Sequence, residues 1–302
     1  MSSAFDKLVY EIQIVSQKEN CTFPRMSNLM VEYINSISFE DFLSILAEIG
    51  TIPERIIHDS TEEKLYSKVT DIILSRSFSE LGLKSKVLTE RANSADVLAE
   101  SVYHNYSLVG DAKAFRLSRT AKNQKDFKVK SMNDWRGDEN DYAVLVSPYN
   151  LYPKTTSQIY SQALTVNVCL FSWEHLYFLL SNHVKESLEC NLSFIWNISN
   201  SFANDPTLSF SDRDKCFIQK TEREICSQLK INKDSFTSVM DFCIKKTIQR
   251  AKLEISYWEK EISVIKTYSR EQAISELIKS KKINEKIKVI KKYIATVELS
   301  NG

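Results

Sequence analysis

The chain has 302 residues, a formal net charge of +1 and a hydrophobic fraction of 43%, which are ordinary values for a globular protein. The balanced charge excludes a polycationic protein, so any affinity for nucleic acid must come from local clusters of Lys and Arg. No run of about 18 apolar residues is present that would span a membrane, and the first residues lack a signal-peptide pattern. The six cysteines form no C-x-x-C pair, which argues against a zinc site or a disulfide framework and favours a cytoplasmic protein.

The N-terminal region, residues 1–58, is predicted to be helical. Only five Gly and five Pro interrupt the whole chain, which favours long helices. The sequence from Ser60 to Glu63 has the form of a capping box, which predicts a helix that begins after Ser60 and ends near Gly82.

The central region, residues 59–180, changes to a mixed pattern. Runs at 94–102 and 106–115 predict a β-hairpin, and two apolar runs at 142–147 and 167–171 predict buried strands. The residues between the hairpin and the third run are expected to form a loop. A mixed β-sheet flanked by helices, an α/β (α+β) fold, is therefore the expected architecture.

The C-terminal region, residues 181–302, is predicted to be helical again. Ile255, Trp258, Ile262 and Ile265 follow a 3-4-3 spacing, and a similar series runs from Ile287 to Val297. Each series is short, so it predicts helix packing within a domain or a dimer. The three regions are expected to form one compact unit.

Asp111-Ala112-Lys113 ends the second strand of the predicted hairpin. Residues i and i+2 of a strand point the same way, so Asp111 and Lys113 would share one face. Asp96 lies near the start of the preceding strand, where an antiparallel partner brings its carboxylate towards Asp111. Two carboxylates suit Mg²⁺, and the lysine suits a phosphate or an activated water. Glu63, on the preceding helix, can supply a further carboxylate through a water, although its capping box also explains it.

A basic stretch, residues 113–130, follows directly. It carries seven Lys or Arg side chains against one acid, Asp126, so its charge is +6 while the rest of the chain is near −5. Asn123 and Gln124 can pair with adenine edges, and Asp126 can accept from cytosine, which suits base reading better than a pure Lys/Arg tract. A solvated charged loop is the simpler alternative.

These motifs resemble one known family. The stretch 114–130, AFRLSRTAKNQKDFKVK, is similar almost letter for letter to the corresponding stretch of the HindIII-type restriction endonucleases. The likeness continues at 60–71, 141–145 and 171–176, and it is weakest at the two ends and across 185–245. The resemblance covers most of the chain.

The resemblance implies a PD-(D/E)xK nuclease fold and a type II restriction endonuclease. Such an enzyme would act as a homodimer on a palindromic six-base site in double-stranded DNA, A^AGCTT. It would need Mg²⁺, with Mn²⁺ as a substitute, and a cognate methyltransferase would protect the host DNA. A structure-specific or repair nuclease of the same fold, and a DNA-binding protein without catalysis, remain alternatives.

The resemblance also implies roles for single residues. Asp96, Asp111 and Lys113 match the catalytic positions, with Asp96 and Asp111 as metal ligands. Glu90 lies near a further family carboxylate, in a shifted register. The residues expected to bind DNA are Arg91, Asn93, Arg116, Arg119, Lys122, Asn123, Gln124, Lys125, Asp126, Lys128 and Lys130.

Overall fold

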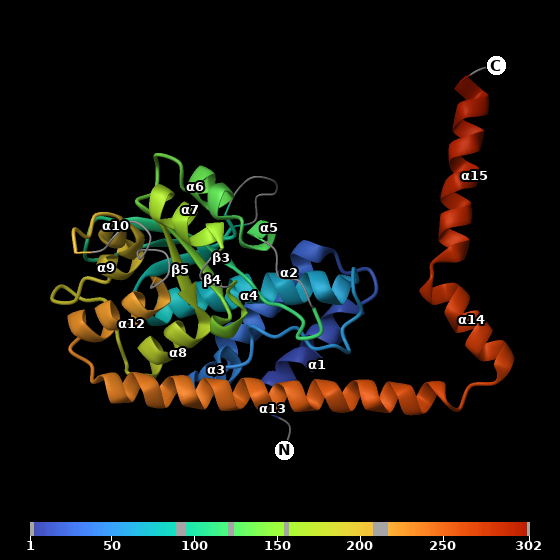
Figure 1. The fold of residues 1–302 in the computed structure, drawn as a ribbon, viewed down its shortest axis with the longest axis horizontal. Helices are drawn as coiled ribbons and strands as arrows, with labels where there is room; N and C mark the ends of the chain where they lie inside the picture. Colours follow the sequence, from blue (N-terminus) through green and yellow to red (C-terminus); the bar gives the residue numbers. More distant parts are fainter. Residues whose placement is uncertain (1–2, 89–94, 120–123, 154–156, 208–216, 301–302) are drawn as a thin grey trace. The chain divides into compact units, whose positions relative to one another are not determined.

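The computed structural model describes residues 3–88, 95–119, 124–153, 157–207 and 217–300 (Figure 1). The chain divides into two compact units, Met1–Ala251 and Lys252–Gly302. The region boundaries expected at residues 58 and 180 both fall within the first unit. In the described part of the chain, no helix combines the length and the apolar character that crossing a bilayer requires.

A five-stranded mixed sheet forms the centre of the first unit (Figure 1). Its strands follow chain order: β1 (Lys84–Val87), β2 (Val97–Glu100), β3 (Ser107–Ala112), β4 (Tyr142–Ser147) and β5 (Val168–Ser172). The pairs β1–β2 and β2–β3 are antiparallel, whereas β3–β4 and β4–β5 are parallel. The central strands are almost entirely buried because helices cover them. The expected mixed sheet with flanking helices is confirmed.

Helix α4 (Thr61–Glu80) packs against β1, β2 and β3 and is the main support of the hairpin. It begins as the sequence predicts, because Ser60 Oγ accepts a hydrogen bond from the Glu63 amide at 3.1 Å. It ends before Gly82, whose φ of 91° is a conformation that glycine adopts without strain. Gly110 of β3 faces this helix closely, since a Cβ there would lie 3.1 Å from both Leu74 and Phe78. The hairpin therefore lies tightly against α4.

Three helices precede α4 in the described part of the chain. They are α1 (Ala4–Ser16), α2 (Phe23–Ser36) and α3 (Phe39–Leu46). Helices α1 and α2 pack with α4, and α3 packs with α1. Ser3 forms a capping box with Asp6 at the start of α1, and Ser38 caps α3. The helical N-terminal region is therefore confirmed.

The stretch expected as a loop between the hairpin and β4 contains two helices, α5 (Gln124–Phe127) and α6 (Val129–Arg136). The expectation of a loop was wrong at α6, because two well-spaced apolar residues, Val129 and Met132, bury its inner face beneath a surface rich in charge. Lys128 separates the two helices in a left-handed conformation, with φ of 40°. Helix α6 packs against β3 and β4 and against α7 (Gln158–Val166).

The remaining helices complete the first unit. They are the short η1 (Tyr149–Leu151), then α8 (Trp173–Ser181), α9 (Ser193–Trp196), α10 (Ile198–Ala203), α12 (Phe217–Gln228) and α13 (Lys233–Ile265). Ser172 caps α8 as expected, since its Oγ accepts from the His175 amide. The second unit holds the end of α13 with α14 (Arg270–Ser280) and α15 (Ile283–Ser300), and α14 and α15 contact each other.

One buried arginine joins α13 to the N-terminal helices. Arg250 is 7% exposed, and its guanidinium donates to Glu48 Oε2 from Nε at 2.9 Å and from Nη2 at 2.7 Å. Nη2 also donates to Asp6 Oδ1 at 3.2 Å. Glu48 is as buried as the arginine, so the ion pair is shielded from water. It holds α13 against α1 and against the residues that follow α3.

We predict that Arg250→Met lowers the free energy of unfolding by about 3 kcal/mol, because it leaves the Glu48 carboxylate buried without its charge partner. Urea denaturation measures the loss. The double variant Arg250→Met/Glu48→Gln should recover part of it. Lys252→Met, at a nearby exposed position, is the matched control. An unchanged unfolding midpoint in Arg250→Met would contradict the prediction.

Candidate active site

The register of the hairpin brings two aspartates together. Val97 of β2 pairs with Gly110 of β3, so one step further along this antiparallel pair Asp96 opposes Asp111. A side-chain hydrogen bond joins the two carboxyl groups. The Leu88 amide donates to the Asp96 carbonyl at 2.8 Å, which fixes the backbone there. The predicted pairing of the two acids therefore follows directly from the sheet.

An open pocket of about 320 Å³ surrounds these carboxyl groups, and we call it the aspartate pocket. It is lined by Phe23, Lys64, Ser67, Lys68, Thr70, Asp71, Asp96, Asp111, Ala112, Lys113 and Ala114. Its side chains come from three parts of the chain: the start of α2, one face of α4 and the strand ends of the hairpin. The pocket unites the three residues that the sequence predicted as catalytic.

A third acid, Asp71, reaches the pocket from α4, and the sequence reasoning did not identify it. Asp71 is 7% exposed, and Lys68 Nζ lies 3.5 Å from its Oδ2. Lys68 Nζ also donates to the Leu88 carbonyl at 3.1 Å, so it joins the helix to the residue before β2. The signal in the sequence is a polar stripe, since Lys64, Lys68 and Asp71 recur at helical spacing among apolar neighbours.

Two of the three carboxyl groups, those of Asp71 and Asp96, have raised pKa values. Burial, then the negative charge of Asp111 and a hydrogen bond with it, together raise the pKa of Asp96 to about 6. Burial, and then the charge of Asp96, raises the pKa of Asp71 well above its usual range. Lys68 and Lys113 lower the pKa of both groups, but less strongly than burial raises it. Three lysines and three aspartates line the pocket, so the raised pKa values come first from burial and then from the closeness of the acids to one another.

Lys113 is held at the edge of this pocket by its backbone. Its amide donates to the Val146 carbonyl at 2.7 Å, and its carbonyl accepts from Trp173 Nε1 at 2.9 Å. Its Nζ forms an ion pair with Asp111 Oδ2. The ammonium group has three N–H donors, so it can bind a phosphate oxygen or a water while it still faces Asp111.

The donor set fits a divalent cation such as Mg²⁺. The pocket offers carboxylate oxygens, which hard cations prefer, and no thiol or imidazole among its lining residues. Asp111 Oδ2 is buried and accepts no hydrogen bond within the described part of the chain, despite its ion pair with Lys113. A buried carboxylate oxygen that contacts one ammonium group outside hydrogen-bond geometry still has a lone pair to offer a cation.

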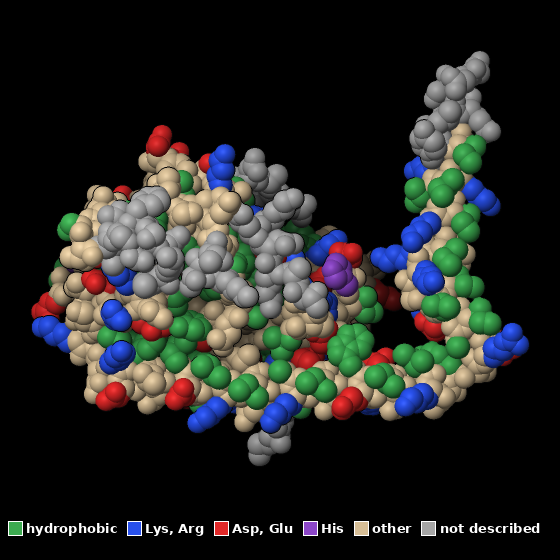
Figure 2. Space-filling view, in the orientation of Figure 1, with side chains coloured by type: hydrophobic (Ala, Val, Ile, Leu, Met, Phe, Trp, Pro, Cys, Tyr) green, Lys and Arg blue, Asp and Glu red, His purple; other side chains and the backbone are tan. Residues whose placement is uncertain are grey.

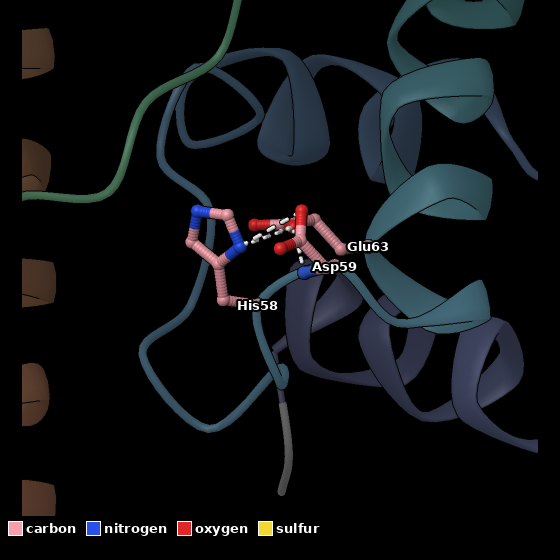
Figure 3. Close-up of side chains that lie close together, drawn as sticks. All are labelled: His58, Asp59 and Glu63. Atoms are coloured by element: carbon pink, nitrogen blue, oxygen red, sulfur yellow. Dashed lines mark hydrogen bonds and ion pairs between the residues drawn. The ribbon is translucent and has the colours of Figure 1, made fainter. Parts of the chain in front are cut away.

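A second acidic group lies elsewhere. Figure 3 shows His58, Asp59 and Glu63 pointing toward one another, and their ligand-type atoms lie within 4.8 Å of one another. Both Glu63 oxygens are already engaged: Oε1 accepts from Arg116 Nη2 at 2.7 Å, and Oε2 accepts from the Asp59 amide at 2.7 Å. These bonds, led by the one from Arg116, hold the pKa of Glu63 below its usual value despite burial. The guanidinium disfavours a cation here, and Glu63 lies outside the aspartate pocket.

The start of the basic stretch is anchored to the loop before α4. Arg116 donates to Glu63 and to the Pro53 carbonyl, and Glu54 accepts from the Ser118 amide at 3.0 Å. Arg116 is therefore largely occupied within the protein. Arg119, which is 44% exposed, pairs with Asp126 at 2.7 Å.

The other expected DNA-binding residues are placed unevenly. Lys128 and Lys130 are exposed, and the Lys128 Nζ lies 5.7 Å from the centre of the Trp135 ring. Gln124 and Lys125 belong to α5, and nothing is described of their side chains. Five of the predicted site residues lie outside the described part of the chain: Glu90, Arg91, Asn93, Lys122 and Asn123.

Comparison with known proteins shows the family of this chain. The HindIII restriction endonuclease family matches residues 6–294. The type II restriction enzyme HindIII of Haemophilus influenzae is 40% identical over 296 residues, which cover 98% of this chain and 97% of that enzyme. Among solved structures, the restriction endonuclease FokI matches 61% of this chain and 34% of its own, with 11% identity and a TM-score of 0.38, which is too low to carry an argument.

The chain is thus one of the type II restriction endonucleases, which are site-specific nucleases that act on DNA. Within this class it belongs to the HindIII restriction endonuclease family. Type II restriction endonucleases generally use divalent metal ions, and the oxygen-rich aspartate pocket is suited to one.

We predict that Asp96→Asn stabilises the metal-free protein by about 2 kcal/mol at pH 8, because it removes a repelled, partly buried charge. The pKa of Asp96 is raised to about 6, so the cost of its charge is present above pH 6 and is absent below its ordinary value of 3.8. The advantage of the variant should therefore vanish as the pH falls towards 4. Thermal unfolding in EDTA across this range measures it, and an advantage that persists at low pH would contradict the electrostatic cause.

Proposed function

We propose that this enzyme cuts double-stranded DNA at the palindromic six-base site A^AGCTT in a reaction that depends on Mg²⁺, with Mn²⁺ as a substitute. The observation that carries the chemistry is the meeting of Asp96, Asp111 and Lys113 in one open pocket. The target sequence is supported by 40% identity to HindIII along almost the whole chain. The enzyme would act as a homodimer in the cytoplasm, where a cognate methyltransferase protects the host DNA.

Asp96 and Asp111 would hold the cation, and Asp71 would complete the set of carboxylates from the opposite side of the pocket. A bound divalent cation lowers the pKa of water and neutralises charge that develops on the scissile phosphate. Asp71 and Asp96 lose their protons more readily once a cation balances their mutual repulsion, so binding is linked to proton release.

Lys113 would orient the attacking water or stabilise the charge on the phosphate, since its ammonium group lies against Asp111 at the pocket edge. The water oxygen forms the new bond to phosphorus, and the bond from phosphorus to the 3′-oxygen breaks. The products are a 3′-hydroxyl, which takes up a proton, and a 5′-phosphate.

The basic stretch would supply DNA recognition. Exposed Lys128 and Lys130 suit contacts with phosphates, whereas Asn123 and Gln124 are of the type that pairs with adenine edges. The Asp126 carboxylate accepts a hydrogen bond from Arg119 in the structure. It could accept one from cytosine N4 instead if bound DNA displaces Arg119. Arg116 contributes by fixing the start of the stretch to Glu63 rather than by a contact of its own.

The cleavage reaction itself is the first test. Purified protein is incubated with a long DNA of mixed sequence, either with Mg²⁺ or with EDTA. We expect discrete fragments whose ends map to AAGCTT, and only with Mg²⁺. A smear, cleavage restricted to junctions, or discrete ends at another sequence would each contradict the proposed specificity.

We predict that Asp111→Asn and Lys113→Ala each lower the cleavage rate by roughly 10²-fold or more, because each removes a charge from the reacting centre. Binding to an AAGCTT duplex in EDTA should largely survive, since neither residue reads a base. Lys7→Ala, an exposed lysine on α1, is the matched control and should cut normally. Full activity in either site variant would exclude its proposed role.

For Asn123→Ala we predict a loss of roughly 1–3 kcal/mol of discrimination at one A·T pair, because a bidentate contact to adenine is removed. Competition binding with singly substituted duplexes measures it. Lys130→Ala should instead weaken binding to all duplexes alike and flatten the salt dependence. If Asn123→Ala leaves the base preference unchanged, Asn123 is not one of the residues that contact base edges.

A further inference from the structure

Lys113 lies one step beyond the end of β3, where the sheet holds its backbone from one side only. In a parallel ladder, a residue donates to one residue of the neighbouring strand and accepts from the residue two positions further along. The Lys113 amide donates to the Val146 carbonyl at 2.7 Å, so the next donor of this ladder would be residue 148. That residue is Pro148, which has no N–H. The strand therefore cannot supply a donor to the Lys113 carbonyl.

The indole of Trp173 supplies the donor that Pro148 lacks. Its Nε1 donates to the Lys113 carbonyl at 2.9 Å, and the residue is only 2% exposed. Trp173 is the first residue of α8, directly after β5, so the bond joins Lys113 to an element beyond the neighbouring strand. Backbone carbonyl groups that leave the solvent need a hydrogen-bond donor, and here a side chain extends the ladder by one step.

Two contacts hold the indole of Trp173 in place. Glu174, the next residue of α8, accepts from the Tyr149 amide at 2.9 Å, which fixes the chain just past Pro148. Gly50 lies against the indole and the proline ring, since a Cβ on Gly50 would be 2.9 Å from Trp173 Cδ1 and 2.6 Å from Pro148 Cγ. The indole is therefore packed too closely to turn away from the Lys113 carbonyl.

The Lys113 ammonium group depends on this backbone anchor. Figure 2 shows Lys and Arg side chains at many points of the protein surface. Such a lysine turns freely about the bonds of its four-carbon stem. Lys113 is different, because its side chain is only 17% exposed and its Nζ lies against Asp111 at the edge of the aspartate pocket. The peptide groups on either side of Lys113 set the direction of its Cα–Cβ bond, and therefore where the ammonium group lies.

We propose that Trp173 is a positioning residue for the cleavage reaction: its indole N–H replaces the ladder donor that Pro148 lacks and so fixes the ammonium group of Lys113 at the aspartate pocket. This inference rests on the proposed function, because it takes Lys113 to be the lysine that acts on the water or the phosphate. Trp173 is not one of the described residues that line the pocket, so it acts through Lys113. Its loss should lower the rate of the chemical step and leave DNA binding unchanged.

Trp173→Phe tests the bond, since phenylalanine keeps an apolar ring but has no N–H. In single-turnover cleavage of an AAGCTT duplex with Mg²⁺, we expect the rate to fall roughly tenfold, because a small displacement of a reacting group is costly. Binding of the same duplex in EDTA should be unchanged. Trp196→Phe is the matched control, because it removes the N–H of another buried tryptophan, which donates to Tyr106 Oη at 3.4 Å, and it should cut at the wild-type rate. An unchanged rate in Trp173→Phe, or an equal loss in both variants, would overturn the proposal.

Restoring the backbone donor is a second test. Pro148→Ala returns an N–H at the position that the ladder requires, and the φ of −57° at this residue suits alanine. In Trp173→Phe/Pro148→Ala, this N–H can donate to the Lys113 carbonyl, so we expect most of the lost rate to return. Loss of packing alone predicts the opposite, because alanine also removes the proline ring that lies beside Gly50. A double variant that cuts no faster than Trp173→Phe would overturn the proposal.

The Lys113→Ala background separates this inference from the proposed function. If Trp173 acts through the Lys113 side chain, Trp173→Phe should not lower the residual rate of Lys113→Ala any further, measured with the enzyme in large excess. A further fall in this background would overturn the positioning role. Full activity in Lys113→Ala would instead contradict the proposed function, whereas loss in Lys113→Ala with full activity in Trp173→Phe contradicts this inference alone.

Discussion

The burial of three neighbouring carboxyl groups in one pocket is the constraint on which the active site depends. The antiparallel pairing of β2 and β3 sets Asp96 against Asp111, and α4 adds Asp71 from the helix that supports the hairpin. Burial removes the water that would solvate the charged carboxylates, and the charge of a neighbouring aspartate adds to this effect, so the pKa values of Asp71 and Asp96 rise. The fold pays for this arrangement with stability, as functional sites commonly do, and a divalent cation removes the cost. The proposed cation site is therefore one that the fold would fill with a divalent ion at a gain in stability.

The residues proposed to cut DNA and those proposed to read its bases are adjacent in the chain, and hydrogen bonds fix the start of the second group. Directly after Lys113, the Phe115 amide donates to the Gly50 carbonyl at 3.0 Å, and Arg116 binds Glu63. These bonds tie the start of the basic stretch to the loop before α4, the same helix that provides Asp71. A shift of the reading segment would therefore be transmitted to the pocket through short, well-bonded connections. This coupling is a physical reason for one continuous segment to serve both tasks.

Much of this arrangement could be predicted from the sequence because its signals are local. Alternating strands, a hairpin and the Asp-x-Lys triplet fix the pairing of Asp96 with Asp111 without knowledge of the rest of the fold. Asp71 could not be found in the same way, since only tertiary packing shows which face of α4 meets the hairpin. Helix α6 was missed because its two buried residues lie within a stretch dominated by charge. Glu63 has the residue type for a metal ligand, but its partner Arg116 is 53 residues away in sequence.

The central claim, that the aspartates form one cation site, is tested most directly by the protons released when Mg²⁺ binds. Calorimetry in buffers of different ionisation enthalpy counts these protons at pH 6 and at pH 8. Because the pKa of Asp96 is about 6 and that of Asp71 is raised, the account predicts clear release at pH 6. It also predicts less release at pH 8 and a reduced count in Asp96→Asn. Binding without proton release at pH 6, or release that Asp96→Asn leaves unchanged, would contradict it.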